Sequence, residues 1–230
     1  MKRITPNDKL ADIVSENFML FSVLNRLGID MAYGELTVRE ACELRTLDIN
    51  LFIVVVNTYI DNKYVPCKEH MNLSLKDLMS FLTKSHIAFR EEFLPMLKGL
   101  FLEIREKDPK SGVAMVNDVY VKAQDQFVKH NIYEDEVVYP YVMKIIEGDN
   151  YEEDEEINNF IATSENSRHL KFNEEMQDLL YIFLKYVRPT CQLEMGKLIG
   201  VLTSFKTDLA HHMAIEDTYF YSQIKKKGNG

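Results

Sequence analysis

A histidine followed four residues later by a glutamate occurs twice, as His130 with Glu134 and as His212 with Glu216. Residues four apart lie one above the other on the same face of an α-helix, so each pair would direct an imidazole nitrogen and a carboxylate to the same point. One nitrogen and one oxygen ligand from each helix suit iron, manganese or zinc. The spacing therefore predicts that both pairs bind metal.

Two further histidines, His86 and His169, lie on other predicted helices. In all four helices the candidate ligands fall on the apolar stripe, where hydrophobic residues recur in steps of three or four. At about 1.5 Å per residue, one candidate from each helix lies roughly 18 to 21 Å from the same end of the helices. The agreement in face and depth predicts that these side chains meet in one buried site.

Four long helical patterns would position these side chains. They span about residues 74–107, 113–147, 155–186 and 190–226. Pro95 lies inside the first pattern and should kink that helix. Because the connecting turns are short, we predict an all-α protein with an up-down-up-down four-helix bundle.

A smaller helical domain is expected before the bundle, over residues 1–62, with a linker over residues 63–73 and the bundle over residues 74–226. Its first helix should span residues 8–27. Thr37 and Glu40 have the spacing of a capping box, and Asp48 is placed to cap the next helix, which carries an apolar run.

Composition excludes several classes of protein. The 230 residues carry a net charge of -9, which argues against nucleic acid as a partner. No apolar run is long enough to span a bilayer, so no membrane association is expected. Three widely spaced cysteines, Cys42, Cys67 and Cys191, predict neither a disulfide framework nor a thiol zinc site. We expect a cytoplasmic protein.

Burial of two carboxylates and four imidazoles would be costly without compensating charge. Two divalent cations would supply it, each binding two imidazoles, with Glu134 and Glu216 bridging them and positions left open for an exogenous ligand.

A single buried histidine is more often a core residue, and His70 and His211 are interpreted as ordinary residues. Glu165 could orient the His169 imidazole or lie at a solvent-facing edge.

The local sequences around the two pairs also resemble a known family. His130-x3-Glu134-x5-Pro140 and Asp208-Leu209-x2-His212-x3-Glu216-Asp217 are similar to the motifs of the hemerythrin-like four-helix domain. The N-terminal residues resemble the small helical domain of the di-iron "repair of iron centres" proteins. That match rests on Leu10-Ala-Asp-Ile-Val, Leu27-Gly-Ile-Asp30 and Leu36-Thr-x2-Glu40-Ala-Cys42.

This resemblance implies a non-haem centre of two iron ions with an oxo or hydroxo bridge. The terminal ligands would be the four histidines His86, His130, His169 and His212, and the bridging ligands Glu134 and Glu216. It implies a role in repairing iron-sulfur centres after nitrosative or oxidative stress, with nitric oxide, oxygen or peroxide as ligand and damaged iron-sulfur proteins as partners. A homodimer and enzymatic turnover both stay open.

The chain departs from the family at one place. Ala32 and Tyr33 occupy the positions where the family usually carries adjacent cysteines, so thiol chemistry cannot occur there. Cys42 remains, but its place on an apolar helix indicates a core residue. The missing cysteines favour one alternative, an oxygen- or nitric oxide-binding sensor or store without a catalytic role. A second alternative, a metal-free helical interaction protein, is also kept.

Overall fold

The computed structural model describes residues 2–61, 63–148, 154–164 and 168–224, with backbone only for residues 162–164 and 168–170. Every regular element in these ranges is a helix, which confirms the all-α prediction. Within these ranges, Lys9 and Thr37 form an isolated antiparallel β-bridge. The chain forms two compact units, one of residues 1–85 with 214–230 and one of residues 86–213.

The first unit begins with short helices. They are α1 (Leu10–Glu16), α2 (Met19–Arg26), α3 (Val38–Arg45), α4 (Ile49–Ile60), the 3-10 helix η1 (Lys68–Met71) and most of α5 (Leu75–Ala88). The single helix expected over residues 8–27 is divided, because Asn17 has an extended backbone and its Oδ1 accepts a hydrogen bond from the Met19 N–H at 3.1 Å. One side chain thus ends the first helix and supports the start of the next.

Helix caps in this unit follow the sequence pattern. The capping box between Thr37 and Glu40 is present at the start of α3. Asp48 caps α4 by accepting from the Asn50 N–H, and its other oxygen accepts from the Ser74 N–H at 2.9 Å. The α4 helix is buried on all sides from Leu51 to Tyr59, so it forms the centre of the unit's core.

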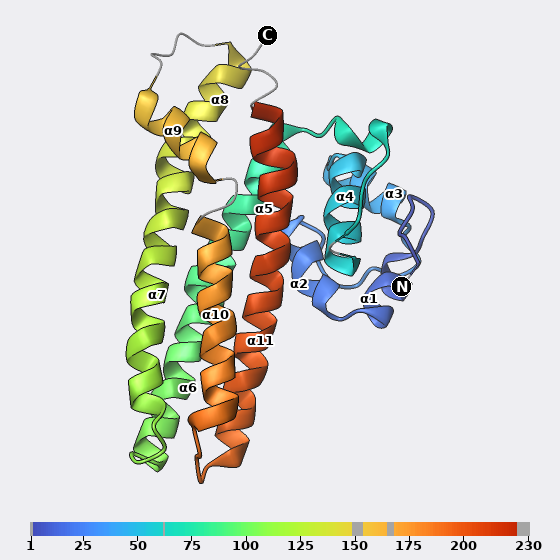
Figure 1. The fold of residues 1–230 in the computed structure, drawn as a ribbon. Coiled ribbons are helices and arrows are strands. Elements are labelled where there is room, and N and C mark those ends of the chain that lie inside the picture. Colours follow the sequence, from blue (N-terminus) through green and yellow to red (C-terminus); the bar gives the residue numbers. More distant parts are fainter. Residues whose placement is uncertain (1, 62, 149–153, 165–167, 225–230) are drawn as a thin grey trace. The chain divides into compact units, whose positions relative to one another are not determined.

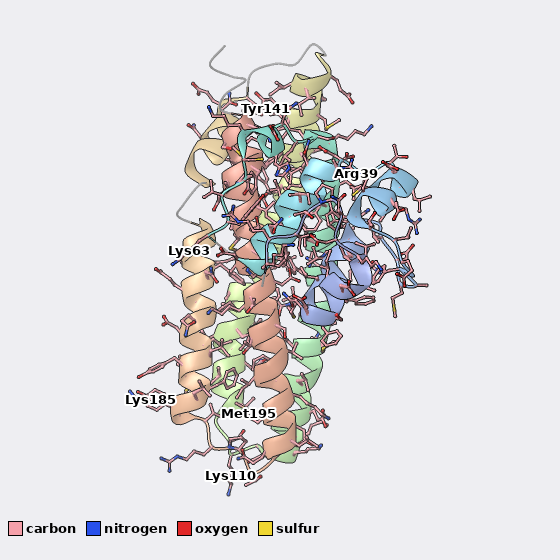
Figure 2. The ribbon with its side chains drawn as sticks, turned by 90° about the vertical axis from the view of Figure 1, so that its right-hand side faces the viewer. Arg39, Lys63, Lys110, Tyr141, Lys185 and Met195 are labelled. Atoms are coloured by element: carbon pink, nitrogen blue, oxygen red, sulfur yellow. The ribbon has the colours of Figure 1, made fainter. Side chains whose placement is uncertain are left out.

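The second unit contains the longer helices. They are the π-helix η2 (Phe89–Phe93), α6 (Leu94–Lys107), α7 (Val113–Tyr133), the π-helix η3 (Glu134–Val138), α8 (Tyr139–Glu147), α9 (Glu155–Ser164), α10 (Arg168–Tyr186) and α11 (Gln192–Ile215) up to residue 213. Figure 1 shows α6, α7, α10 and α11 running alongside one another. Lys110, Lys185 and Met195 lie at the same end of this unit (Figure 2).

The core of the second unit centres on Phe205 of α11. Its ring lies 5.6 Å from those of Phe89 and Phe93, 5.8 Å from that of Phe127 on α7, and 6.5 Å from that of Phe172 on α10. Apolar residues of η2, α6, α7, α10 and α11 join the same buried cluster. One continuous apolar interior thus holds these helices together.

Three of the expected long helices contain a π-helical segment: η2 in the first, η3 in the second and η4 (Glu216–Tyr221) in the fourth. The first two segments each end two residues before a proline, Pro95 after η2 and Pro140 after η3. A proline has no N–H and crowds the carbonyl four residues earlier, so it is best accommodated where the regular α-helical bonding is restarted. The expected disturbance at Pro95 therefore takes the form of a π turn. The third expected helix, over residues 155–186, is described as α9 and α10.

No helix within the described residues combines the length and the hydrophobicity needed to cross a bilayer.

Candidate metal centre

Glu134 lies between two histidines in the second unit. Its Oε1 is 3.2 Å from the Nε2 of His130, one turn earlier on the same helical segment, and its Oε2 is 3.7 Å from the Nε2 of His86 at the end of α5. The side chains of Glu134 and His86 are inaccessible to solvent, and that of His130 is 13% exposed. One buried carboxylate thus directs a different oxygen to each of two imidazoles from different helices, as a bridging ligand would.

His212 of α11 also contacts His86. The two Nε2 atoms are 3.0 Å apart, and both side chains are buried. Two nitrogen ligands at about 2.1 Å from one metal ion, with a right angle between them, are separated by about 3.0 Å. The observed separation therefore suits a shared cation as well as a direct hydrogen bond between the rings.

Three π-helical segments begin at or just after candidate ligands. η3 begins at Glu134, η4 (Glu216–Tyr221) begins at Glu216, and η2 begins three residues after His86. A π turn inserts one residue into a helix and shifts the face presented by the following residues, and such turns concentrate at functional sites. The elements that carry the candidate ligands are thus locally distorted where the ligands lie.

The structure describes the remaining candidates, Glu216, His169 and Glu165, to different extents. Glu216 is fully buried and follows His212 by four residues along the helical run from α11 into η4, but it belongs to the first unit. His169 lies in the first turn of α10, where only the backbone is described. Glu165 lies outside the described residues. Ligation stays a prediction for all six candidates, and the contacts given above do not include His169 or Glu216.

The carboxylate of Asp135 also contacts the candidate centre, although the sequence analysis did not identify it. Asp135 places its Oδ1 2.8 Å from the Nδ1 of His86 and its Oδ2 2.8 Å from a terminal guanidinium nitrogen of Arg90. Arg90 is four residues after His86, and this spacing was the available signal because such residues share a helix face. Asp135 sits in an acidic run, Glu134 to Glu136, which reads by itself as a solvated face.

The two histidines interpreted as ordinary residues are His70 and His211. His70 is in the 3-10 helix η1 of the first unit. His211 is partly buried on α11, and burial is the main cause that lowers its pKa, partly offset by the nearby Asp208 carboxylate.

A cavity of about 630 Å³ opens beside His130, between α7, α9 and α10. Aromatic side chains form much of its wall, including Phe127, Phe160 and Phe172, and the His130 ring lies 5.5 Å from that of Phe160. Lys129 and Lys171 are among its charged lining residues. This cavity leaves one face of the candidate centre open to a small ligand.

The donor set fits a first-row transition metal. Imidazole nitrogens and a carboxylate oxygen are the ligands that iron, manganese and zinc share. A buried carboxylate among buried imidazoles is also where a cation would lower the cost of burial most. The described donor atoms are 3.0 to 3.7 Å apart, a separation that two ligands of one metal ion can span.

Comparison with known proteins gives one informative similarity. The chain is 19% identical over 230 residues to the "Iron-sulfur cluster repair protein ScdA" of Staphylococcus haemolyticus (strain JCSC1435), and the alignment covers 96% of this chain and 99% of that protein. No protein-family model matches the chain. No solved structure matches it either. The full-length similarity supports the resemblance to iron-sulfur cluster repair proteins.

Proposed function

We propose that this protein is a non-haem di-iron protein that takes part in repairing iron-sulfur centres damaged by nitrosative or oxidative stress. The observation that carries the proposal is the position of Glu134, with one oxygen toward His86 and the other toward His130. The similarity to an iron-sulfur cluster repair protein over nearly the whole length of both chains supports the repair role.

The proposed ligands extend beyond the contacts described above. Four histidines and two glutamates would hold the two iron ions: His86, His130, His169, His212, Glu134 and Glu216. We place them in a hemerythrin-like up-down-up-down bundle over residues 74–226, preceded by a linker and a helical domain over residues 1–62. The shared core around Phe205 supports this arrangement.

Iron at this site would supply the capacity to bind and reduce nitric oxide, oxygen or peroxide. The chain's own contribution is to fix the imidazoles, to exclude water from Glu134 and His86, and to leave His130 reachable from the adjoining cavity. Damaged iron-sulfur proteins would be the partners. The positions usually occupied by adjacent cysteines are Ala32 and Tyr33, so the repair would proceed without thiols there.

A repair assay tests the role. Purified protein is loaded with iron under anaerobic conditions and added to an iron-sulfur dehydratase inactivated by nitric oxide, and the recovery of dehydratase activity is measured. We expect recovery with the wild-type protein and with Glu136→Gln, an exposed neighbour of the site, but not with Glu134→Gln. Iron-loaded wild-type protein that binds oxygen reversibly but restores no activity would contradict repair and indicate a store or sensor.

A further inference from the structure

Asp135 and Arg90 form a charged pair at the outer edge of the candidate centre. The carboxylate uses one oxygen for the Nδ1 of His86 and the other for the guanidinium of Arg90, each at 2.8 Å. The side chain of Asp135 is 12% exposed and that of Arg90 is 23% exposed, whereas that of His86 is 1% exposed. The pair therefore reaches from solvent to a fully buried ring.

We propose that Asp135, held by Arg90, is a positioning residue that fixes the tautomer and orientation of His86. An ionised carboxylate only accepts hydrogen bonds, and a guanidinium only donates them. With Arg90 donating to Oδ2, the remaining oxygen must accept a hydrogen bond from the Nδ1–H of His86. A neutral imidazole carries one N–H, so the Nε2 lone pair is left free.

The free lone pair is directed where a ligand is needed. The Nε2 of His86 faces the Nε2 of His212 at 3.0 Å and the Oε2 of Glu134 at 3.7 Å. The imidazole ring also stacks on Tyr139, with an interplanar angle of 11° and 6.0 Å between ring centroids. Asp135 thus holds one edge of the ring and Tyr139 lies against its face, so Nε2 keeps a single direction.

Loss of the carboxylate would change more than one hydrogen bond. In the opposite tautomer, the His86 Nε2–H would donate toward Glu134 or His212 and could not bind a metal. Carboxylates that accept from the second nitrogen of a metal-binding histidine typically change metal affinity by about 10- to 100-fold when they are removed. The effect on metal affinity rests on the proposed iron centre, whereas the tautomer is a property of the metal-free protein.

The test uses full-length protein labelled with ¹⁵N-histidine, with the His86 signals assigned by their loss in His86→Gln. In the metal-free wild-type protein we expect the Nδ1–H tautomer. In Asp135→Asn the carboxamide should turn its oxygen to Arg90 and its NH₂ to His86, which forces the Nε2–H tautomer. Iron affinity should then fall by about 10- to 100-fold, while Asp125→Asn, an exposed α7 residue paired with Lys129, changes neither property.

An Nε2–H tautomer at His86 in the metal-free wild-type protein would overturn the inference without any variant. So would a folded Asp135→Asn protein, judged by its circular dichroism, that keeps the Nδ1–H tautomer and the wild-type iron affinity. Failure of the wild-type protein to bind iron would instead contradict the proposed function, and the tautomer measurement would still decide the role of Asp135.

Discussion

Two regions of the second unit share the elements η2, α7 and α11 but hold together in different ways. The aromatic core consists of Phe89, Phe93, Phe127, Phe172 and Phe205, whose rings contact one another directly. The polar cluster consists of His86, Arg90, His130, Glu134, Asp135 and His212.

The difference between the regions is energetic. Aromatic rings packed against each other stabilise the fold through burial and dispersion and need no partner beyond their neighbours. Buried carboxylates and imidazoles cost free energy unless charge is balanced and hydrogen bonds are made. Phe89 belongs to the aromatic core, and its ring also packs edge-on against that of His212, with 5.3 Å between ring centroids. The aromatic core therefore contacts the polar cluster directly. The aromatic core thus contributes the stability, and the polar cluster carries the proposed chemistry.

Truncating the centre of the aromatic core should have the largest effect. Phe205→Ala removes a fully buried ring that packs on residues of η2, α7 and α10, and it should lower the free energy of unfolding by about 3 to 5 kcal/mol. Urea denaturation of the metal-free protein measures this loss. Leu193→Ala, on the same helix but 69% exposed, should change it by less than about 0.5 kcal/mol. Similar losses in the two variants would refute the distinction.

Removing the charge of Glu134 should reduce the stability that the protein gains on binding metal, but should leave the metal-free protein folded. At a free iron concentration about one hundred times the dissociation constant, binding to the native state adds about 2.7 kcal/mol of stability. Glu134→Gln should lose most of this increment, because the bridging carboxylate is gone, while its metal-free form stays folded. Thermal unfolding with and without Fe(II) measures the increment, and Glu136→Gln is the matched control. An undiminished increment in Glu134→Gln would mean that the cluster does not bind the metal.

A polar atom inside the apolar region offers a smaller test. Tyr120 stacks on Phe101 with 5.0 Å between ring centroids, and its buried hydroxyl has no hydrogen-bond partner among the described residues. Burial raises the pKa of this hydroxyl, so it stays neutral. Tyr120→Phe should therefore be as stable as the wild-type protein or more stable by up to about 1 kcal/mol, measured by urea denaturation. A clear loss of stability would reveal a polar role for the hydroxyl.

The smallest effect is expected at the surface. The Asp108 carboxylate accepts hydrogen bonds from the Thr190 N–H at 2.7 Å and from its hydroxyl at 2.9 Å, and these bonds lower the pKa of Asp108. A lowered pKa means that this contribution is complete at neutral pH and is lost as the pH falls through the folded-state value in the acid range. Asp108→Asn should therefore show a slightly weaker fall in melting temperature below about pH 4 than the wild-type protein. Identical pH profiles would show that the contact contributes nothing.

What the sequence could predict depended on how local each signal was. The His130 and Glu134 pair and the Thr37 and Glu40 capping box rest on spacings of three or four residues, and the structure contains both contacts. The break at Asn17 was missed because an apolar stripe carries no information about a side chain that hydrogen-bonds to the first residue of the next helix. Asp135 was missed because its partners lie more than forty residues away along the chain.

The π turns explain the remaining difference. Assigning residues to helix faces from the sequence assumes that the α-helical period continues along the whole segment. Each π turn breaks this period, so the residues after it lie on a different face from the one assigned. Pro95 and Pro140 indicated a disturbance, but not that it would take the form of an inserted residue next to a candidate ligand. Local spacing therefore pointed to the contact between His130 and Glu134, but not to Asp135, which contacts the candidate ligand His86.

The most direct test of the central claim is the iron stoichiometry of the protein after anaerobic titration with Fe(II), measured by metal analysis together with the optical spectrum after oxidation. We predict two iron ions per chain and an oxo-bridged diferric absorption band in the wild-type protein and in Glu136→Gln. Both should be lost in Glu134→Gln, with the helical content unchanged. Wild-type protein that retains no iron, or Glu134→Gln protein that keeps the full stoichiometry and spectrum, would contradict it.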